Sequence, residues 1–441
     1  MLTLLLDTLK SFDGAEYLVR ETKTRRLESY NIKKQSEMLR EVETTKLGLV
    51  LYVVFDEDGK KYRGSYNTEI HPDTSSAELR EKIEQGLYAA RFVKNEYFEL
   101  VPPSPHKAEP MGETDAVQAL ADLQTAFYAG DCREGGHLSY SEFFVTRNDV
   151  RIVNSAGVDV SYATYNLFAE TAVHWKGRQE KEIEIYESYE TSLPLASPAD
   201  TSLACNMLKD RINRLFAVAE KKSVARPTPH VGDINILLTG ECLVLFFDFF
   251  RIRANAQMVY QQFATYKEGA MVQGQDQSSG CDRITLTLDP KLEGSSYGSP
   301  YDEHGQPLET HTIIRDGKLL KYWGDTRFAG YLGIPPTGNI HSFRVTGGTA
   351  GGEDLRRGPH LELVSFSDFH ADPVTGDFGS EIRLGFYFDG EKTVPVTGGS
   401  ISGNMAAVQD TLRMSAEERQ YNHYRGPATV CIRGASISGV E

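Results

Sequence analysis

The stretch Asp233-Ile-Asn-Ile-Leu-Leu-Thr-Gly-Glu-Cys-Leu-Val-Leu-Phe-Phe-Asp-Phe-Phe-Arg-Ile-Arg253 is the most informative part of the chain for its architecture. Its first residues, Asp233–Leu238, are rich in branched apolar side chains and predict a β-strand. Thr239-Gly240-Glu241 then predicts the start of a helix. From Leu243 to Phe250 this helix is apolar nearly all round, and a helix of that kind is expected to be buried in a core.

The residues after this helix are rich in glycine. Of the 39 glycines in the chain, 26 lie between Gly269 and the C-terminus. Asp316-Gly317 and Asp389-Gly390 each lie between strand-like runs and predict hairpin turns, because glycine adopts positive φ angles at little cost. Residues 232–441 are therefore expected to form a glycine-rich antiparallel β domain.

Residues 1–105 are expected to form an N-terminal α/β unit. Leu47–Phe55 and Lys61–Thr68 flank the turn Asp58-Gly59 and predict a β-hairpin. Ser75-x-x-Glu78 has the spacing of a capping box and predicts the start of a helix. A proline-rich segment, residues 101–110, is typical of a linker and is expected to end this unit.

Residues 111–229 are expected to form a middle α+β unit. Ala116–Tyr128 predicts a helix, and Glu142–Glu187 predicts two or three strands. Ser197 is expected to cap a second helix. Its apolar stripe would consist of Leu208, Ile212, Leu215 and Ala219. The three units together predict an α+β fold.

The composition excludes several classes of partner. The chain has 441 residues and a formal net charge of −15, because 62 Asp and Glu outnumber 47 Lys and Arg. A surface this acidic repels nucleic-acid phosphates and anionic lipids, so no direct nucleic-acid or membrane partner is expected. The apolar start Met1–Leu6 is too short for a signal peptide, and the apolar run Leu49–Phe55 is far shorter than the roughly 20 residues that span a bilayer. The sequence predicts a cytoplasmic protein.

The common signatures of catalytic sites are absent from the sequence. No P-loop, GxSxG elbow, HExxH or HExxxH motif occurs. Asp368, His370 and Asp372 would share one face of a strand and could hold a metal, but their sequence is more typical of a solvated turn. The five cysteines lie at wide spacings without a CxxC pair and are expected to be reduced thiols, mostly in the core.

An ordered series of short motifs in the last third of the chain is more specific than any of these. It consists of Tyr301–Pro307, Ile313–Leu320, Gly338-Asn339, Asp372–Gly379, Phe388-Asp-Gly and Pro395–Asn404. In order and spacing the series resembles the TldD/PmbA (TldE) family, also called modulators of DNA gyrase. The resemblance extends upstream through Val153–Gly157 and the capped helix of the N-terminal unit, so it covers nearly the whole chain.

The resemblance implies one of two kinds of subunit. The TldD kind carries an HExxxH motif on a helix directly after a core strand, with a cysteine near the C-terminus. Its two histidines bind zinc, and its glutamate is the general base for the metal-bound water. The PmbA/TldE kind lacks the motif and pairs with the TldD kind. Such pairs are peptidases that act on unfolded or small peptides, including the maturation of modified peptides.

This chain departs from the catalytic kind at the motif itself. In an ungapped alignment, Asp248–Arg253 takes the place of HExxxH, and neither histidine is present. Phe249 replaces the glutamate and cannot accept a proton, and Arg253 would repel a dication. Cys431 lies near the C-terminus, where the resemblance implies a cysteine in the catalytic kind, but a core cysteine is the preferred interpretation. No catalytic residue and no metal are therefore expected on this chain, and zinc is expected on a TldD-like partner.

The three degenerate motif positions, Asp248, Phe249 and Arg253, are expected to lie together near an internal cleft. Phe249 and Phe250 would pack inward, and Arg253 would find a carboxylate or a peptide carboxyl group. The alternative is an ordinary core helix with Arg253 reaching solvent.

The preferred interpretation is a zinc-less PmbA/TldE-like subunit that completes a peptide-holding chamber with a TldD-like subunit. Open β edges in the glycine-rich sheet would accept an extended peptide by strand addition. Without its partner, the chain is expected to form a homodimer through an apolar interface. Two alternatives remain open: a self-contained peptidase or hydrolase with an unrecognised site, and a non-enzymatic modulator of DNA gyrase.

Overall fold

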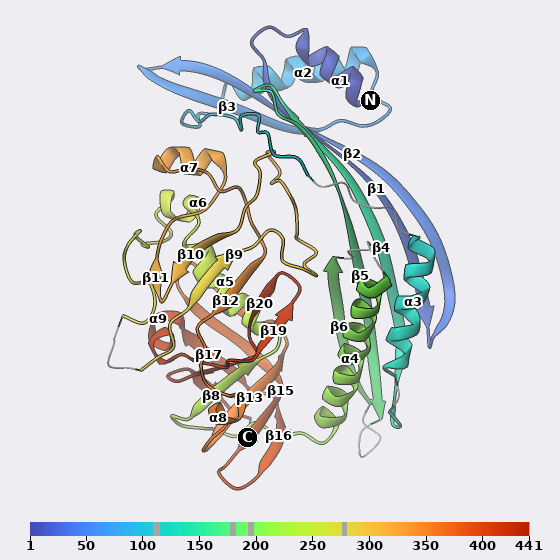
Figure 1. Ribbon diagram of the computed structural model, residues 1–441, viewed down its shortest axis with the longest axis vertical. Helices are drawn as coiled ribbons and strands as arrows, with labels where there is room; N and C mark the ends of the chain where they lie inside the picture. Colours follow the sequence, from blue (N-terminus) through green and yellow to red (C-terminus); the bar gives the residue numbers. More distant parts are fainter. Residues whose placement is uncertain (109–114, 132, 177–181, 193–197, 276–279, 441) are drawn as a thin grey trace.

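A long, curved sheet arches over the C-terminal half of the chain (Figure 1). The computed structural model describes residues 1–108, 115–131, 133–176, 182–192, 198–275 and 280–440, with the backbone alone for 198–204. The sheet is built from β1 (Glu16–Ile32), β2 (Gln35–Glu57), β3 (Lys60–Glu69), β4 (Gly136–Asn154), β5 (Asp159–Lys176) and β6 (Glu182–Ser192). Its strand order is β3-β2-β1-β4-β5-β6, and all neighbours are antiparallel.

The predicted hairpin is confirmed as β2 and β3. Asp58 and Gly59 connect the two strands with φ angles of 51° and 75°, which is the left-handed turn geometry that matches the twist of the strands. The sequence reasoning missed β1, which pairs with β2 along one edge and with β4 along the other. The two N-terminal units therefore share one sheet, and their division at residues 105 and 111 stays a prediction.

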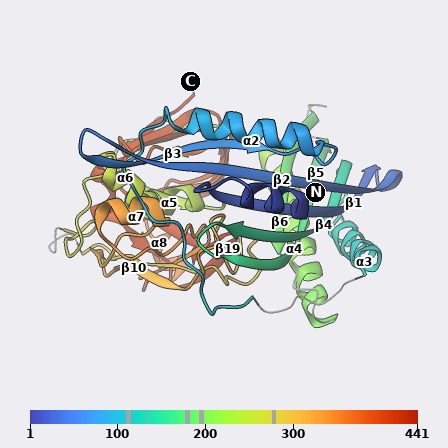
Figure 2. The same cartoon turned by 90° about the horizontal axis from the view of Figure 1, so that it is seen from above.

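Four helices cover one face of this sheet: α1 (Leu2–Lys10), α2 (Ser76–Ala90), α3 (Ala116–Ala129) and α4 (Pro198–Ser223). Val19 packs in the core under α1 and α2, and Leu27 packs against the core under α3 and α4. Eight residues separate them on β1, so both point to the same face. Figure 2, seen from above, shows α2 lying along the strands.

The local signals for these helices are largely confirmed. The Ser75 hydroxyl accepts a hydrogen bond from the Glu78 amide, and the Glu78 carboxylate accepts one from the Ser75 amide, so the capping box is present. The predicted apolar stripe of α4 is buried. Ser197, its predicted cap, lies outside the described residues.

The C-terminal half contains two further sheets. The second sheet contains β9 (Thr285–Leu288), β10 (His311–Arg315), β11 (Lys318–Leu319), β12 (Phe343–Thr346), β19 (Glu418–Tyr421) and β20 (Tyr424–Pro427). The third sheet contains β7 (Arg226–Pro227), β8 (Asn235–Thr239), β13 (His360–Phe366), β14 (His370–Ala371), β15 (Asp377–Phe388), β16 (Thr393–Thr397), β17 (Ser400–Asn404), β18 (Arg413–Met414), β21 (Thr429–Ile432) and β22 (Ser436–Ser438). Their helical segments are α5 (Cys242–Arg253), α6 (Ala256–Tyr260), α7 (Thr326–Leu332), α8 (Gly352–Leu355), α9 (Met405–Val408) and the short 3-10 helix η3 (Gln409–Thr411).

Most strand pairs of these sheets are antiparallel, as expected, and the fold is α+β. The second sheet has the order β11-β10-β9-β12-β20-β19, and the main path of the third is β18-β21-β8-β13-β15-β16-β7. Parallel pairing occurs at β8–β13, β12–β20 and β7–β16. Both predicted hairpin turns are present, at Asp316-Gly317 between β10 and β11 and at Asp389-Gly390 between β15 and β16.

The helix α5 lies in the core between these two sheets, as its composition predicts. Gly240, with a φ angle of 88°, turns the chain from β8 into the helix, a conformation that suits glycine. Phe246, Phe247 and Phe250 are fully buried, and one hydrophobic cluster joins α5 to strands of both sheets. Among the described residues, no helix combines the length and apolar character needed to cross a membrane.

Contacts at both ends of the curved sheet join it to the C-terminal half. At one end, Tyr331 packs against Phe98 and donates a hydrogen bond to the carbonyl oxygen of Glu96 at 2.7 Å. At the other end, Glu190 of β6 accepts hydrogen bonds from Ser296 at 3.2 Å and Asn422 at 3.4 Å. The face of the sheet that the four helices leave uncovered therefore faces the C-terminal half (Figure 1).

Candidate functional site

A cavity of about 340 Å³ lies beside the C-terminal end of α5. Phe249 and Arg253 contribute to its wall together, because residues four apart in a helix share one face. The segment 265–275 and the turn 374–376 supply most of the remaining wall. Two of the three predicted motif positions therefore meet at a cavity.

Arg253 is held by main-chain and aromatic groups. Its Nη1 donates hydrogen bonds to the carbonyl oxygens of Pro373 at 2.8 Å and Val374 at 3.1 Å. Its guanidinium carbon lies 5.3 Å from the ring centre of Phe249 and 5.1 Å from that of Tyr266. The sequence predicts a carboxylate partner for Arg253, but none pairs with it among the described residues. The guanidinium contacts two carbonyl oxygens and two aromatic rings instead.

Asp248 does not join the other two positions, and the expectation that all three lie together is wrong. Successive residues of an α-helix are rotated by about 100°, so Asp248 points away from the face shared by Phe249 and Arg253. Its carboxylate forms an ion pair with Arg251, one turn along the helix. Arg251 also donates to the carbonyl oxygen of Ile340 at 3.1 Å and packs over the Trp323 ring.

Two histidines, exposed His341 and half-buried His423, lie near this ion pair. The ring of Tyr297 lies between them, with centroid distances of 5.8 Å to His341 and 4.9 Å to His423. Burial lowers the pKa of both imidazoles, and Arg251 lowers it further, whereas Asp248 acts in the opposite direction. Both side chains are therefore kept neutral around pH 7.

The other residues singled out from the sequence do not form a metal centre. Cys431 is buried in a small apolar cluster with Leu237, and burial raises its pKa, which confirms a core cysteine. The Asp372 carboxylate accepts the amide hydrogens of Val374 and Thr375, so the predicted turn is confirmed. Among the described residues, no group of three or more His, Cys, Asp or Glu is placed to hold a metal ion.

The cysteines match the prediction in part. Among the described residues, Cys242 and Cys431 are buried, as expected of core cysteines, whereas Cys205 and Cys281 are half-buried. Cys132 lies outside the described residues.

A second cavity, of about 410 Å³, lies between the curved sheet and the C-terminal half. Phe144 of β4 and Phe168 of β5 stack at 5.2 Å on the uncovered face of the sheet, and Arg26 of β1 lies over the Phe144 ring. Glu190 and Tyr297 complete the wall. Sequence reasoning missed this site because its residues come from four strands and a distant loop. The Phe143-Phe144 pair is a local sign of a strand with aromatic residues on both faces.

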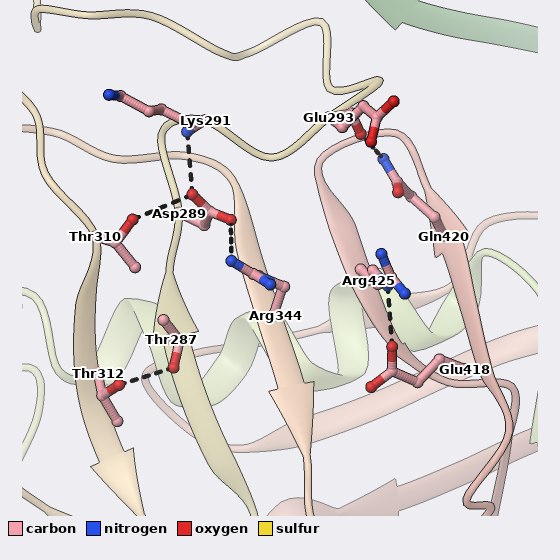
Figure 3. A network of polar contacts seen from close by, with 10 residues as sticks. All are labelled: Thr287, Asp289, Lys291, Glu293, Thr310, Thr312, Arg344, Glu418, Gln420 and Arg425. Carbon is pink, nitrogen blue, oxygen red and sulfur yellow. Dashed lines mark hydrogen bonds and ion pairs between the residues drawn. The ribbon is translucent and has the colours of Figure 1, made fainter. Parts of the chain in front are cut away.

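Polar contacts near the ends of several strands of the second sheet anchor the loop that carries Tyr297 (Figure 3). Buried Asp289 accepts hydrogen bonds from Thr310 and from the amide of Lys291, and forms an ion pair with Arg344 of β12. Gln420 of β19 donates to the carbonyl oxygen of Glu293 at 2.6 Å. These contacts hold residues 289–293, the segment that leads to Tyr297 at the second cavity.

The C-terminal half matches a known family of domains. Residues 231–439 match the model of the PmbA/TldA metallopeptidase C-terminal domain. The chain is 29% identical over 130 residues to the metalloprotease PmbA of Escherichia coli O157:H7, covering 28% of this chain and 29% of that protein. The chain belongs to the PmbA/TldD family. This membership confirms the resemblance carried by the motifs in the last third of the sequence.

Two solved structures share the fold over the whole length. A candidate modulator of DNA gyrase from Thermotoga maritima has a TM-score of 0.77 at 15% identity, covering 99% of this chain and 100% of that one. TldE from Thermococcus kodakarensis has a TM-score of 0.72 at 15% identity, covering all of both chains. An uncharacterised protein of Methanocaldococcus jannaschii is 21% identical over 281 residues, covering 60% of this chain and 66% of that protein. The sequence alignments thus span less than two thirds of either curated relative.

The side chains at the aligned motif positions of this PmbA/TldD-family chain do not fit a zinc ion. Phe249 has no donor atom, and Arg253 is a cation whose Nη1 donates to carbonyl groups. Asp248 has a carboxylate, but it faces Arg251 on another side of the helix. A zinc site needs three or four converging N, O or S ligands.

Proposed function

We propose that this chain is a zinc-less, non-catalytic PmbA/TldE-like subunit, which works in the cytoplasm with a TldD-like zinc subunit on unfolded or small peptides. The observation that carries the proposal is the pair of side chains at the end of α5. Phe249 replaces a general base without offering a proton acceptor, and Arg253 replaces a zinc ligand with a permanent cation. The partner subunit would supply the zinc and the general base.

The cavity between the curved sheet and the C-terminal half supports a role in holding peptides. Its size is in the range of small-ligand sites, and its wall combines stacked aromatic rings with one cation and one anion, Arg26 and Glu190. Side chains of an unfolded peptide would pack on Phe144 and Phe168. The end strand β19 of the second sheet is an edge to which an extended segment of the peptide or of a partner subunit could add.

The first test measures zinc and peptidase activity in the isolated chain and in a mixture with the TldD-like subunit of the same organism. The isolated chain is expected to retain no stoichiometric zinc after dialysis and to leave a denatured protein substrate intact. The mixture is expected to hydrolyse it and to elute as a complex in size-exclusion chromatography. Stoichiometric zinc with peptidase activity in the isolated chain would favour the self-contained enzyme. A TldD-like subunit whose activity is independent of this chain would favour the non-enzymatic regulator.

The second test addresses the cavity between the sheet and the C-terminal half. In the mixed enzyme, Tyr297→Ala is expected to raise the KM for peptide about five- to tenfold with little change in kcat, because an aromatic wall of the binding surface is lost. Tyr88→Ala, at a side chain that is 66% exposed on α2, is the matched control and should leave KM unchanged. A normal KM in Tyr297→Ala would place peptide binding elsewhere.

A further inference from the structure

The described wall of the cavity beside the end of α5 is positively charged, although the chain is acidic. Arg253 and Lys267 both line it, and no Asp or Glu is among the described residues of its wall. Two uncharged side chains of the wall are already engaged: Asn404 Nδ2 donates to the Thr375 carbonyl and to Asp377, and Gln275 Nε2 donates to the Met271 carbonyl. In a chain of net charge −15, two cations facing one cavity without a described carboxylate favour an anionic ligand.

The Arg253 guanidinium is positioned but not neutralised. Its Nη1 is occupied by two carbonyl oxygens, and the rings of Phe249 and Tyr266 restrict its plane. Its Nε is buried and has no hydrogen-bond partner among the described residues. It forms no ion pair with a described carboxylate, and no carboxylate or carbonyl group of the described residues accepts a hydrogen bond from its Nε–Nη2 edge. That edge carries two parallel N–H groups, which is the geometry that binds the two oxygens of a carboxylate.

Tyr266 provides a second unsatisfied donor at the same place. Its hydroxyl oxygen is buried and has no hydrogen-bond partner among the described residues. Burial raises the pKa of Tyr266, and the neighbouring Arg253 guanidinium, through its charge and its closeness to the hydroxyl, opposes this rise only in part, so the hydroxyl keeps its proton. Buried polar groups of folded proteins are normally satisfied, and two such groups in contact around one cavity indicate a ligand that supplies acceptors.

We infer that this cavity binds a carboxylate group, anchored by Arg253 and supported by Tyr266 and Lys267. A cavity of about 340 Å³ accommodates the last residues of a short peptide or a small organic acid. A phosphate group is a poorer match, because it carries more charge and more acceptor oxygens than one free guanidinium edge and two further donors can satisfy. The inference rests on the cavity itself and does not require the subunit role proposed above.

Isothermal titration of the full-length chain with four compounds tests the inference: N-acetyl-alanyl-alanine, its C-terminal amide, sodium acetate and inorganic phosphate. The free acid is expected to bind at least about tenfold more tightly than the amide, because only the acid completes the charged hydrogen bonds. Arg253→Lys keeps the charge but loses the planar pair of donors, and should weaken binding about tenfold.

Lys267→Ala separates ligand binding from folding. Lys267 is exposed and makes no hydrogen bond to a described residue through its side chain, so its loss should weaken binding several-fold without changing the melting temperature. Lys60→Ala, at an exposed lysine in the β2–β3 turn, is the matched control and should bind like the wild type. The zinc and peptidase assays are independent of this result.

The comparison of acid and acetate identifies the source of the carboxylate. Tighter binding of the peptide acid supports a peptide terminus, and equal binding of acetate supports a small organic acid; both support the inference. Equal binding of acid and amide, tighter binding of phosphate, or unchanged affinity in both Arg253→Lys and Lys267→Ala would overturn it.

Discussion

Replacing Phe247 with alanine is expected to lower the free energy of unfolding of the C-terminal half by about 3–5 kcal/mol. The Phe247 ring is fully buried, stacks on Tyr424 at 5.7 Å between ring centres and meets Phe246 edge-on at 5.4 Å. These residues belong to the cluster in which α5 and both C-terminal sheets meet. Because the surrounding elements are held by sheet hydrogen bonds, they cannot collapse into the space that the ring leaves.

Urea unfolding followed by tryptophan fluorescence measures this effect. Trp323 lies in the same core as Phe247, whereas Trp175 lies in the core under α3 and α4, so a Trp175→Phe background reports on the C-terminal half alone. Phe263→Ala, at a ring that is 49% exposed, is the control and should change stability by no more than about 0.5 kcal/mol. An unchanged unfolding midpoint in Phe247→Ala would mean that this core is not closely packed.

Gly64→Ala is expected to be similarly damaging at the other end of the molecule. A Cβ atom at position 64 would lie 1.8 Å from the carbonyl oxygen of Ala90 and 2.9 Å from that of Val93. Both oxygens belong to the backbone at the end of α2, so no side-chain rotation relieves the overlap. Separating α2 from β3 would open the N-terminal core, and we expect a loss of about 3 kcal/mol or more.

Thermal unfolding followed by circular dichroism tests this prediction, with Gly330→Ala as its control. Gly330 lies in α7, and an added Cβ there would meet no atom within 4 Å. Alanine also has a higher helix propensity than glycine, so this variant should be neutral or more stable by about 1 kcal/mol. A Gly64→Ala variant that melts with the wild type would show that β3 and α2 can separate without cost.

The features predicted correctly from the sequence depend on neighbouring residues. The hairpin at Asp58-Gly59 needs only a turn that tolerates positive φ, and the capping box needs only two side chains three positions apart. The burial of α5 follows from its own composition, and Phe249 and Phe250 do pack inward. In each case the physical information lies within about one turn or one strand of sequence.

The strand β1 was missed because its stability does not come from its own pattern. Its central residues, Thr22–Arg26, are polar or charged, and the first half of β2, Gln35–Lys46, is exposed on both faces. These segments are strands because each hydrogen-bonds to a neighbour over a long register. Pairing between distant segments leaves no hydrophobic period by which a strand could be recognised.

By itself, the sequence determined the local elements, the family motifs and the chemical character of the α5 positions, because these depend on residue type and short spacing. Tertiary structure alone decided that β1–β6 form one sheet and that Phe144, Phe168 and Tyr297 share a cavity. It also decided that Phe249 and Arg253 face a second cavity while Asp248 faces Arg251. The physical reason is that helix rotation separates adjacent residues by about 100°, and only long-range packing determines what each face of the helix meets.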